Sequence, residues 1–433
     1  MTTDDAAAFA RTATLTDAPD AVAEQVRVRV LDTLAAITAG YRMPDIEVVR
    51  GYALDHHGGQ AATVLDGTGR TCTLAGATLA NATAANALDI DDGHRAVKGH
   101  PAAVVIPPAL AAAEATDATI GAFCDAVLIG YELAVRAGLA IHATDGVYTG
   151  TGSWGAVGAA AAVARVRGLS VERTADALGT AEYHAPRTPI MRGVEQPGMT
   201  KDGIGWGAHA GAVAADLADR GFTASGTVFD EADVTATATL GERYQVTEGY
   251  LKPYPCCRWA HPGIDAVLDL RERHGIDPSA VETIRVHTFT EATHLDTRTP
   301  DSAQAAEYSY PYPVGAALAR GRFTAAELRS DVRTREDVAR LADSVELTAD
   351  PAIDARFPEE CLARVELETE ADTYVSDMTR PRGARERPLD SEAHDRKLER
   401  LCGPTIDDKE VNRIRETITN REIPIRELLN SWR

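Results

Sequence analysis

Residues 155–164 read GAVGAAAAVA, and residues 207–218 read GAHAGAVAADLA. If either stretch forms a helix, its glycine and alanine faces let neighbouring helices approach closely. Such helices need other helices on most sides, so the two stretches favour a multi-helix bundle. Apolar residues recur at helical spacing in several further stretches of the first 270 residues. These stretches are 21–39, 77–88, 108–115 and 123–142.

The pattern changes after about residue 275. Residues 281–290, VETIRVHTFT, alternate between polar and β-branched apolar types, which predicts a strand. Further strands are predicted at 345–348, 361–368 and 373–378, and helices at 312–320 and 335–342. We therefore predict a multi-domain protein of the α and α+β classes. A large all-helical domain over 1–270, completed by 400–433, is expected beside a smaller α/β domain over 271–399.

The composition limits the compartment and the partners. The chain of 433 residues has 65 acidic and 44 basic residues, a formal net charge of −21, so its surface would repel nucleic-acid phosphates. No apolar run approaches the roughly 20 residues of a membrane span, and the N-terminus MTTDDAAAFA lacks the basic residues of a signal peptide. Six cysteines without a C-x-x-C spacing indicate a reducing, cytoplasmic setting.

Lysine is nearly absent. Only five of the 44 basic residues are lysines, at positions 98, 201, 252, 397 and 409. An acidic chain with so few lysines is typical of adaptation to molar salt, where charge repulsion is screened over roughly 3 Å. We hypothesise a salt-loving host. If surface lysines have been lost, those that remain are enriched in roles that arginine cannot fill.

Residues 89–101, DIDDGHRAVKGHP, place three carboxylates, two imidazoles, an arginine and a lysine in one loop after a predicted helix. Such a loop is suited to acid–base chemistry on an anionic substrate. Aspartate and histidine could also bind a divalent metal ion, and a solvated loop with capping aspartates is a third interpretation. The residues alone leave these three alternatives open.

Two glycine-rich turns precede predicted helices. Residues 146–155, GVYTGTGSWG, could present main-chain N–H groups to a carboxylate or phosphate. They contain G-x-G-x-x-G, but no strand precedes it, which disfavours a dinucleotide site. In MTKDGIG, residues 199–205, Lys201 stands near a helix start, an unfavourable place for a cation unless an anion binds there too.

Two further motifs contain polar aromatic and cationic residues. In YLKPYPCCRWAH, residues 250–261, Lys252 and Arg258 flank a proline-rich turn and could hold a carboxylate. Cys257 is either a nucleophile or a packing residue. In YSYPY, residues 308–312, a tyrosine that opens a helix could donate a proton, or the tyrosines could pack in the core.

In this order along the chain, the five motifs resemble the MmgE/PrpD family, which includes 2-methylcitrate dehydratases, cis-aconitate decarboxylases and iminodisuccinate epimerases. The resemblance extends from about residue 10 to the C-terminus. It implies an all-helical domain built from both ends of the chain, an inserted α/β lid, and an active site in the cleft between them. It also implies a homodimer without an organic cofactor. We assign no metal ligands.

The resemblance also implies roles for single residues. Asp89, His100, Lys201, Lys252 and Tyr312 match the aspartate, the histidine, the two lysines and the lid tyrosine of the family.

The remaining candidates lie where this chain departs from the family pattern. Asp92 is an alternative to Asp89, because the loop is one residue longer than in the decarboxylases. Thr149 and Cys257 stand where decarboxylase-like members have histidines, and His94 could replace one of those imidazoles. The loss of two imidazoles speaks against cis-aconitate decarboxylation.

The family chemistry is proton transfer at a carbon next to a carboxylate. We expect Lys201, Lys252 and Arg258 to hold the carboxylates of a small substrate, while His100 exchanges a proton with Tyr312 or Lys201. The first choice is a lyase of the 2-methylcitrate dehydratase type. The alternatives are an epimerase of a dicarboxylate such as iminodisuccinate, a cis-aconitate decarboxylase, and an anion-binding protein that has lost catalysis.

Overall fold

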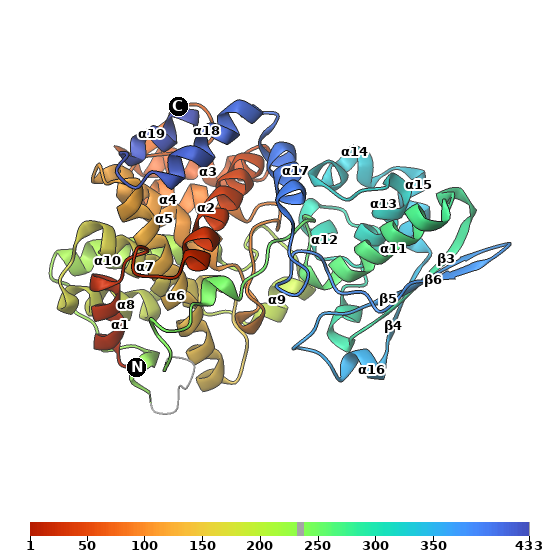
Figure 1. The fold of residues 1–433 in the computed structure, drawn as a ribbon, viewed down its shortest axis with the longest axis horizontal. Coiled ribbons are helices and arrows are strands. Elements are labelled where there is room, and N and C mark those ends of the chain that lie inside the picture. Colours follow the sequence, from red (N-terminus) through yellow and green to blue (C-terminus); the bar gives the residue numbers. More distant parts are fainter. Residues whose placement is uncertain (232–237, 433) are drawn as a thin grey trace.

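A computed structural model describes residues 1–231 and 238–432. Ten helices of the described residues form a bundle that we call the helical part, together with the three C-terminal helices introduced below (Figure 1). The ten are α1 (Thr3–Thr12), α2 (Asp20–Gly40), α3 (Ile46–His56), α4 (Leu74–Ala85), α5 (Pro101–Ala115), α6 (Ile120–Asp145), α7 (Thr151–Arg167), α8 (Val171–His184), α9 (Ile190–Glu195) and α10 (Ile204–Asp219).

Helix α7 packs against α5, α6, α8 and α10, and its small residues make this possible. A Cβ atom at Gly158 would collide with the carbonyl of Gly130 in α6. One at Gly207 in α10 would collide with the backbone of Gly152 in α7. The close approach predicted from the glycine- and alanine-rich stretches is therefore present. It places the start of α7 directly against the turn that precedes α10.

The second region, which we call the sheet part, runs from α11 to β6. Its four strands are β3 (Val281–Thr288), β4 (Val345–Ala349), β5 (Arg364–Thr369) and β6 (Thr373–Val375), in the order β4-β3-β5-β6. Strand β3 is parallel to β4 and antiparallel to β5, with Ile284 opposite both Val345 and Leu367. Ile284, Val286 and Thr288 are buried, in the alternation expected of this strand.

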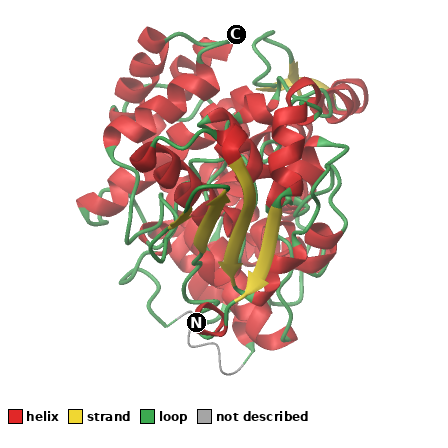
Figure 2. Ribbon diagram, turned by 90° about the vertical axis from the view of Figure 1, so that its right-hand side faces the viewer, coloured by secondary structure: helices red, strands yellow, loops and turns green. Residues whose placement is uncertain are grey.

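Helices cover one face of this sheet. Figure 2, which looks at the end of the molecule formed by the sheet part, shows the strands in front of helices. Helix α11 (His261–His274) packs on β5, α13 (Pro311–Arg320) on β4, and α15 (Glu336–Asp343) on β3. The shorter helices are α12 (Ala303–Glu307), α14 (Ser330–Arg333) and α16 (Pro351–Asp354).

The last three helices return to the helical part. Helix α17 (Ser391–Cys402) packs on α2, α18 (Asp408–Thr419) on α2 and α17, and α19 (Ile425–Leu429) on α5. Figure 1 shows α18 and α19 beside the N-terminal helices, and α17 between them and the sheet part. Both ends of the chain thus contribute to one bundle.

The predicted fold class, a large helical region beside a smaller mixed one, is confirmed. The helical part also contains a short hairpin that was not predicted, β1 (Gly58–Thr63) with β2 (Thr71–Cys72). The domain limits at 270 and 400 stay predictions. All six cysteines are free thiols. Among the described helices, none combines the length and apolar character needed to cross a bilayer.

Candidate active site

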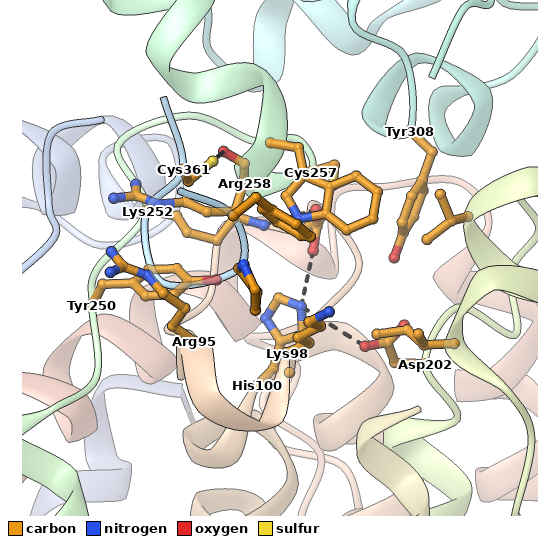
Figure 3. Close-up of a pocket in the computed structure, with 17 residues that line it drawn as sticks. Arg95, Lys98, His100, Asp202, Tyr250, Lys252, Cys257, Arg258, Tyr308 and Cys361 are labelled. Atoms are coloured by element: carbon orange, nitrogen blue, oxygen red, sulfur yellow. Dashed lines mark hydrogen bonds and ion pairs between the residues drawn. The ribbon is translucent and has the colours of Figure 1, made fainter. Parts of the chain in front are cut away.

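A pocket lies between the helical part and the sheet part. The loop after α4, the short helix α9 and the turn at 250–261 form one side, and Phe357, Pro358 and Cys361 from the sheet part form the other (Figure 3). Its charged or titratable lining includes Asp89, Arg95, Lys98, His100, Asp202, Lys252 and Arg258. In a chain of net charge −21, a pocket with four arginine or lysine side chains and two carboxylates is a local concentration of positive charge.

His100 is the last residue before α5 and is buried at the centre of this group. Its Nδ1 lies 2.8 Å from the main-chain oxygen of Asp92 and 3.2 Å from Oδ2 of Asp91. Because a carbonyl oxygen only accepts, Nδ1 donates its proton there, and Nε2 is the nitrogen left for proton exchange. Nε2 lies 3.4 Å from Oδ1 of Asp89.

The surroundings of His100 favour its charged form. Burial lowers the pKa of the imidazole, but the carboxylates of Asp91 and Asp89 outweigh burial and raise it to about 9. The same attraction outweighs burial at Asp91 and lowers its pKa. His100 is therefore an imidazolium at neutral pH, and so it can give up a proton to a substrate.

Lys252 pairs with Asp89 inside the protein. Its Nζ lies 2.7 Å from Oδ2 of Asp89, and both side chains are almost fully buried. Burial lowers the pKa of Lys252, but Asp89 and Tyr250 more than compensate, so the pKa is raised and the amine stays charged. Tyr250 is paired through its backbone with Gly93, where a Cβ atom would collide with the tyrosine ring. The glycine in the D-D-G-H motif is thus needed for this approach.

Lys201 is buried behind the pocket wall. Its Nζ donates to the main-chain oxygens of Asn86 and Ala87, each at 2.7 Å, and to the carboxylate of Glu307 at the end of α12. Burial raises the pKa of Glu307 to about 8, against the opposing attraction of Lys201. This contact between Lys201 and Glu307 joins the helical part to the sheet part beside the pocket.

Four of the five lysines lie at or next to the pocket. Lys98 lines it, with Nζ 3.8 Å from the centroid of the Tyr148 ring. Lys397 in α17 is buried and donates to the main-chain oxygen of Ile90, at 2.9 Å, within the loop that contains Asp89. Lys409 is exposed. The scarcity of lysine in the sequence was therefore a useful guide to the residues around the pocket.

Backbone strain is concentrated in the same place. Among the described residues, only four other than glycine have a positive φ angle, and three of them are Asp89, Lys98 and Lys201, at 47°, 48° and 40°. The fourth is Asp117. Such a conformation costs of order 1–3 kcal/mol per residue and persists where the surroundings fix it, often at functional sites.

Asp202 and Tyr308 complete the pocket. Thr151, at the start of α7, donates to Oδ2 of Asp202 at 3.1 Å, and the N–H of Gly152 donates to the main-chain oxygen of Asp202. The glycine-rich turn therefore holds Asp202 in place. Burial raises the pKa of Asp202, against the attraction of His100, whose Nε2 lies 4.0 Å from Oδ2. The hydroxyl of Tyr308 points toward Asp202 (Figure 3).

Two of the predicted residues of the first loop do not face the pocket. Asp92 accepts from Tyr131 at 2.9 Å and from the N–H of Ala102 at 2.9 Å, and its Oδ2 lies 3.2 Å from Nε of Arg29. Asp92 therefore caps α5 and anchors the loop. His94 lines a neighbouring pocket, and burial lowers its pKa to about 4. A neutral imidazole there does not replace a histidine of the site.

Tyr312 and Thr149 are also placed elsewhere. The hydroxyl of Tyr312 donates to the main-chain oxygen of Glu327, within the sheet part, so the tyrosine of the YSYPY motif that lines the pocket is Tyr308. Tyr312 was predicted from the match of its motif to the family, and a motif match does not determine the direction of a side chain. The hydroxyl of Thr149 lies 2.6 Å from that of Ser153, and its main-chain N–H donates to Nε2 of His142 at 3.1 Å. Thr149 is not among the residues that line the pocket.

Cys257 and Arg258 do line the pocket. Burial raises the pKa of the Cys257 thiol to about 12, which disfavours a thiolate nucleophile. The guanidinium of Arg258 stacks 4.5 Å from the centroid of the Tyr250 ring and donates to the main-chain oxygens of Pro381 and Arg382. Both terminal nitrogens of the guanidinium thus already donate to protein oxygens. Arg258 therefore contributes positive charge to the pocket rather than a bidentate hydrogen bond to a substrate carboxylate.

One group of side chains in the described residues has the spacing of a metal site. One ligand atom from each of Asp89, Asp91 and His100 lies within 4.8 Å of the others. Here Nζ of Lys252 and the imidazolium of His100 already provide the positive charge that the two carboxylates require. The donor set is therefore better matched to internal cations than to a divalent ion.

The residues of the site that were missed as candidates include Asp91, Lys98, Asp202 and Tyr308. Each is within four residues of a predicted candidate, in the motifs D-I-D-D, V-K-G-H, T-K-D-G and Y-S-Y-P-Y. The motifs contained the signal, but only the folded backbone determines which of their side chains meet.

Comparisons with known proteins agree with this architecture. The MmgE/PrpD N-terminal domain matches residues 4–246, and the MmgE/PrpD C-terminal domain matches residues 254–423. A cis-aconitate decarboxylase of Aspergillus terreus (strain NIH 2624 / FGSC A1156) is 24% identical, over 96% of this chain and 93% of its own length. A cis-aconitate decarboxylase-like protein of Aspergillus oryzae is 23% identical, over 94% and 91%. The predicted resemblance is confirmed, and this chain belongs to the MmgE/PrpD family.

Proposed function

We propose that this protein is a cofactor-independent lyase of the 2-methylcitrate dehydratase type, which eliminates water from a hydroxylated di- or tricarboxylic acid. One observation supports the proposal most strongly. The charged imidazolium of His100 and the carboxylate of Asp202 line the same pocket, with Nε2 and Oδ2 4.0 Å apart. Elimination of water needs an acid for the leaving hydroxyl and a base for the neighbouring C–H group, and these two side chains supply both.

The cations of the pocket suit a polyvalent carboxylate. Lys98 forms no ion pair with a carboxylate of the described residues, and Arg95 and Arg258 add charge at the lining. Lys252 is neutralised by Asp89, so Lys98 is the cation best placed to bind a substrate carboxylate directly. An anion that enters here gains more than it would on the surface, because the site is partly desolvated and the remaining chain is acidic.

The proposed reaction balances within the site. Asp202 takes the proton from the carbon next to a carboxylate, the electron pair of that C–H bond forms the double bond, and the C–O bond breaks. His100 Nε2 gives its proton to the departing hydroxyl, which leaves as water. Asp202 is then protonated and His100 neutral, and a water that bridges these two side chains would return the proton to His100. No external oxidant, reductant or cofactor is required.

Decarboxylation is the second candidate, because the named relatives over nearly the full length are cis-aconitate decarboxylases or decarboxylase-like. In that reaction the C–C bond to one carboxylate breaks, CO2 leaves, and His100 would protonate the carbon that remains. A base is not needed, so Asp202 would have no direct role.

The test is a product analysis in molar KCl. Purified protein is incubated with 2-methylcitrate, citrate, isocitrate and cis-aconitate, and absorbance of the new C=C bond and released CO2 are both recorded. We expect an unsaturated acid from a hydroxy acid, without CO2. Release of CO2 from cis-aconitate would establish the second candidate instead, and solvent deuterium exchange without net product would indicate an epimerase.

Two variants separate the candidates further. Asp202→Asn should abolish water elimination but would leave a decarboxylase largely active. Cys257→Ser is the matched control, because Cys257 lines the same pocket and has no role in the proposed reaction. It should retain activity to within a few-fold.

A further inference from the structure

A second pocket, on the other side of the Asp89–Asp92 loop, is strongly basic. Its lining contains Arg42, Arg322, Arg329, Lys397 and Arg400, and no acidic side chain is among the lining residues that the structure describes. In a chain with 65 acidic residues, five cations around one cavity without a carboxylate are unusual. The pocket shares no lining residue with the active-site pocket.

The cations come from both parts of the molecule. Arg42 follows α2, and Lys397 and Arg400 lie in α17, all in the helical part. Arg322 and Arg329 lie in the segment after α13, in the sheet part. Figure 1 shows α17 beside the end of the sheet part that contains α14. An anion in this pocket would therefore contact both parts at once.

Two of the arginines lack the partner that most arginines of this chain have. Arg42 donates to the main-chain oxygens of Thr38, at 3.2 Å, and Leu401, at 2.7 Å, and to the hydroxyl of Thr405. Arg400 forms no ion pair within the described residues, although Glu399 precedes it. By contrast, Arg322 lies 3.2 Å from a carboxylate oxygen of Glu327 and Arg329 lies 3.0 Å from one of Asp331.

We infer that this pocket is a second anion site, which binds a small polyvalent oxyanion between Arg42 and Arg400 on one side and Arg322 and Arg329 on the other. The planar guanidinium matches the paired oxygens of phosphate and carboxylate groups. Several converging guanidinium groups favour a polyvalent oxyanion over chloride, because chloride has no paired oxygen atoms that could accept two hydrogen bonds from one guanidinium. Arg42 and Arg400 are both exposed residues that line the pocket, so an anion from solvent can reach their guanidinium groups.

The floor of the pocket connects it to the active site. Ile90, between Asp89 and Asp91, lines the pocket, and its main-chain oxygen accepts from Lys397. Lys397 also lies 2.7 Å from Asp32, which satisfies its charge. The oxyanion is therefore expected to bind the arginines and to leave the Lys397–Asp32 pair intact.

The test measures thermal unfolding at fixed molar KCl while inorganic pyrophosphate or tricarballylate is added. The wild type should show a saturable rise in Tm. The response to the two probes identifies whether phosphate or carboxylate oxygens are preferred, and a response that the arginine variants weaken supports the site. Arg42→Gln/Arg400→Gln should raise the half-saturating concentration at least about tenfold, because each lost charge-assisted hydrogen bond weakens binding by that order.

Controls separate this site from the active site. Arg396→Gln, one turn earlier on α17 and paired with Glu392, should behave as the wild type. Should the double variant fail to fold, Arg400→Gln alone is used, because Arg400 is exposed and forms no ion pair in the described chain. The inference is overturned if the wild type shows no saturable rise, or if the arginine variants keep the wild-type half-saturation, since the probe would then bind elsewhere.

Discussion

Nδ1 of His100 lies 3.2 Å from Oδ2 of Asp91, at the same ring nitrogen that donates to the main-chain oxygen of Asp92. The pair fixes the orientation of the ring and raises the pKa of His100 to about 9 despite burial. His100 can therefore act as an acid at neutral pH, and the position of this pKa can be tested.

Asp91→Asn should make the acid weaker. The kcat/KM of the wild type should fall as the pH rises through about 9, because His100 loses the proton that the reaction needs. Loss of the Asp91 charge should move this alkaline limb down by about 1 to 3 pH units. The pH profile of kcat/KM measures the shift, and His94→Gln, whose imidazole lies outside the pocket, should leave the limb in place.

The same linkage affects folding. The pKa of His100 is raised from 6.5 in the unfolded chain, so the stability that it contributes is fully present below 6.5 and is lost as the pH rises through about 9. Asp91→Asn should flatten this part of the stability profile in denaturant titrations. An unchanged alkaline limb and an unchanged stability profile in Asp91→Asn would argue against the assignment of His100 as a charged acid.

The buried pair of Lys252 and Asp89 predicts a rescue of stability without a rescue of activity. Lys252→Met leaves the buried Asp89 carboxylate without its closest cation and with only His100 nearby, which should cost about 3 kcal/mol in the free energy of unfolding, the lower end for breaking a buried pair. Lys252→Met/Asp89→Asn removes both charges and should recover most of that loss in urea unfolding, while turnover stays absent. A double variant no more stable than Lys252→Met would show that the two residues are not energetically coupled.

Tyr308 and Tyr312 form a natural pair of test and control. Tyr308→Phe removes a hydroxyl that lines the pocket and points toward Asp202, and the loss of a hydrogen bond from this hydroxyl to the bound carboxylate substrate should lower kcat/KM at least about tenfold. Tyr312→Phe removes only the bond to Glu327 and should cost about 1 kcal/mol of stability with near-normal kcat/KM. The reverse result would restore Tyr312 as the reacting tyrosine.

Much of the fold could be predicted because it depends on local patterns. The small residues of α7 and α10 specify close helix packing, and the alternation in β3 specifies a strand with one buried face. Helix α17 was not predicted, because SEAHDRKLERLC is mostly polar and is stabilised by packing on α2. Hairpin β1–β2 was not predicted, because its strands are too short to show an alternating pattern and depend on pairing with each other.

The sequence motifs that form the site could be predicted, but which of their side chains face one another could not. The loop of Asp89 and His100, the turn of Lys252 and the start of α10 were all identified and do converge. Which carboxylate of the loop faces His100 depends on the positive φ of Asp89 and on the anchoring of Asp92 by Arg29. Neither is visible in residue types, so Asp91 was passed over and Asp92 was kept.

The acidic composition predicts a dependence on salt. Mutual repulsion within a chain of net charge −21 should destabilise the folded state at low ionic strength, and molar KCl reduces the Debye length to about 3 Å. We expect Tm to rise markedly between low and molar KCl in calorimetry. Equal Tm values in both conditions would refute the hypothesis of a salt-loving host. Light scattering in the same buffers tests the expected homodimer.

The most direct test of the central claim compares His100→Gln with the wild type on the hydroxy acid that the product analysis identifies. Glutamine keeps a polar side chain but cannot deliver a proton. We predict that turnover falls at least about 100-fold, the usual contribution of a general acid, while tricarballylate still binds in calorimetry because Lys98 remains. A variant that eliminates water at a rate within a few-fold of the wild type would contradict the account.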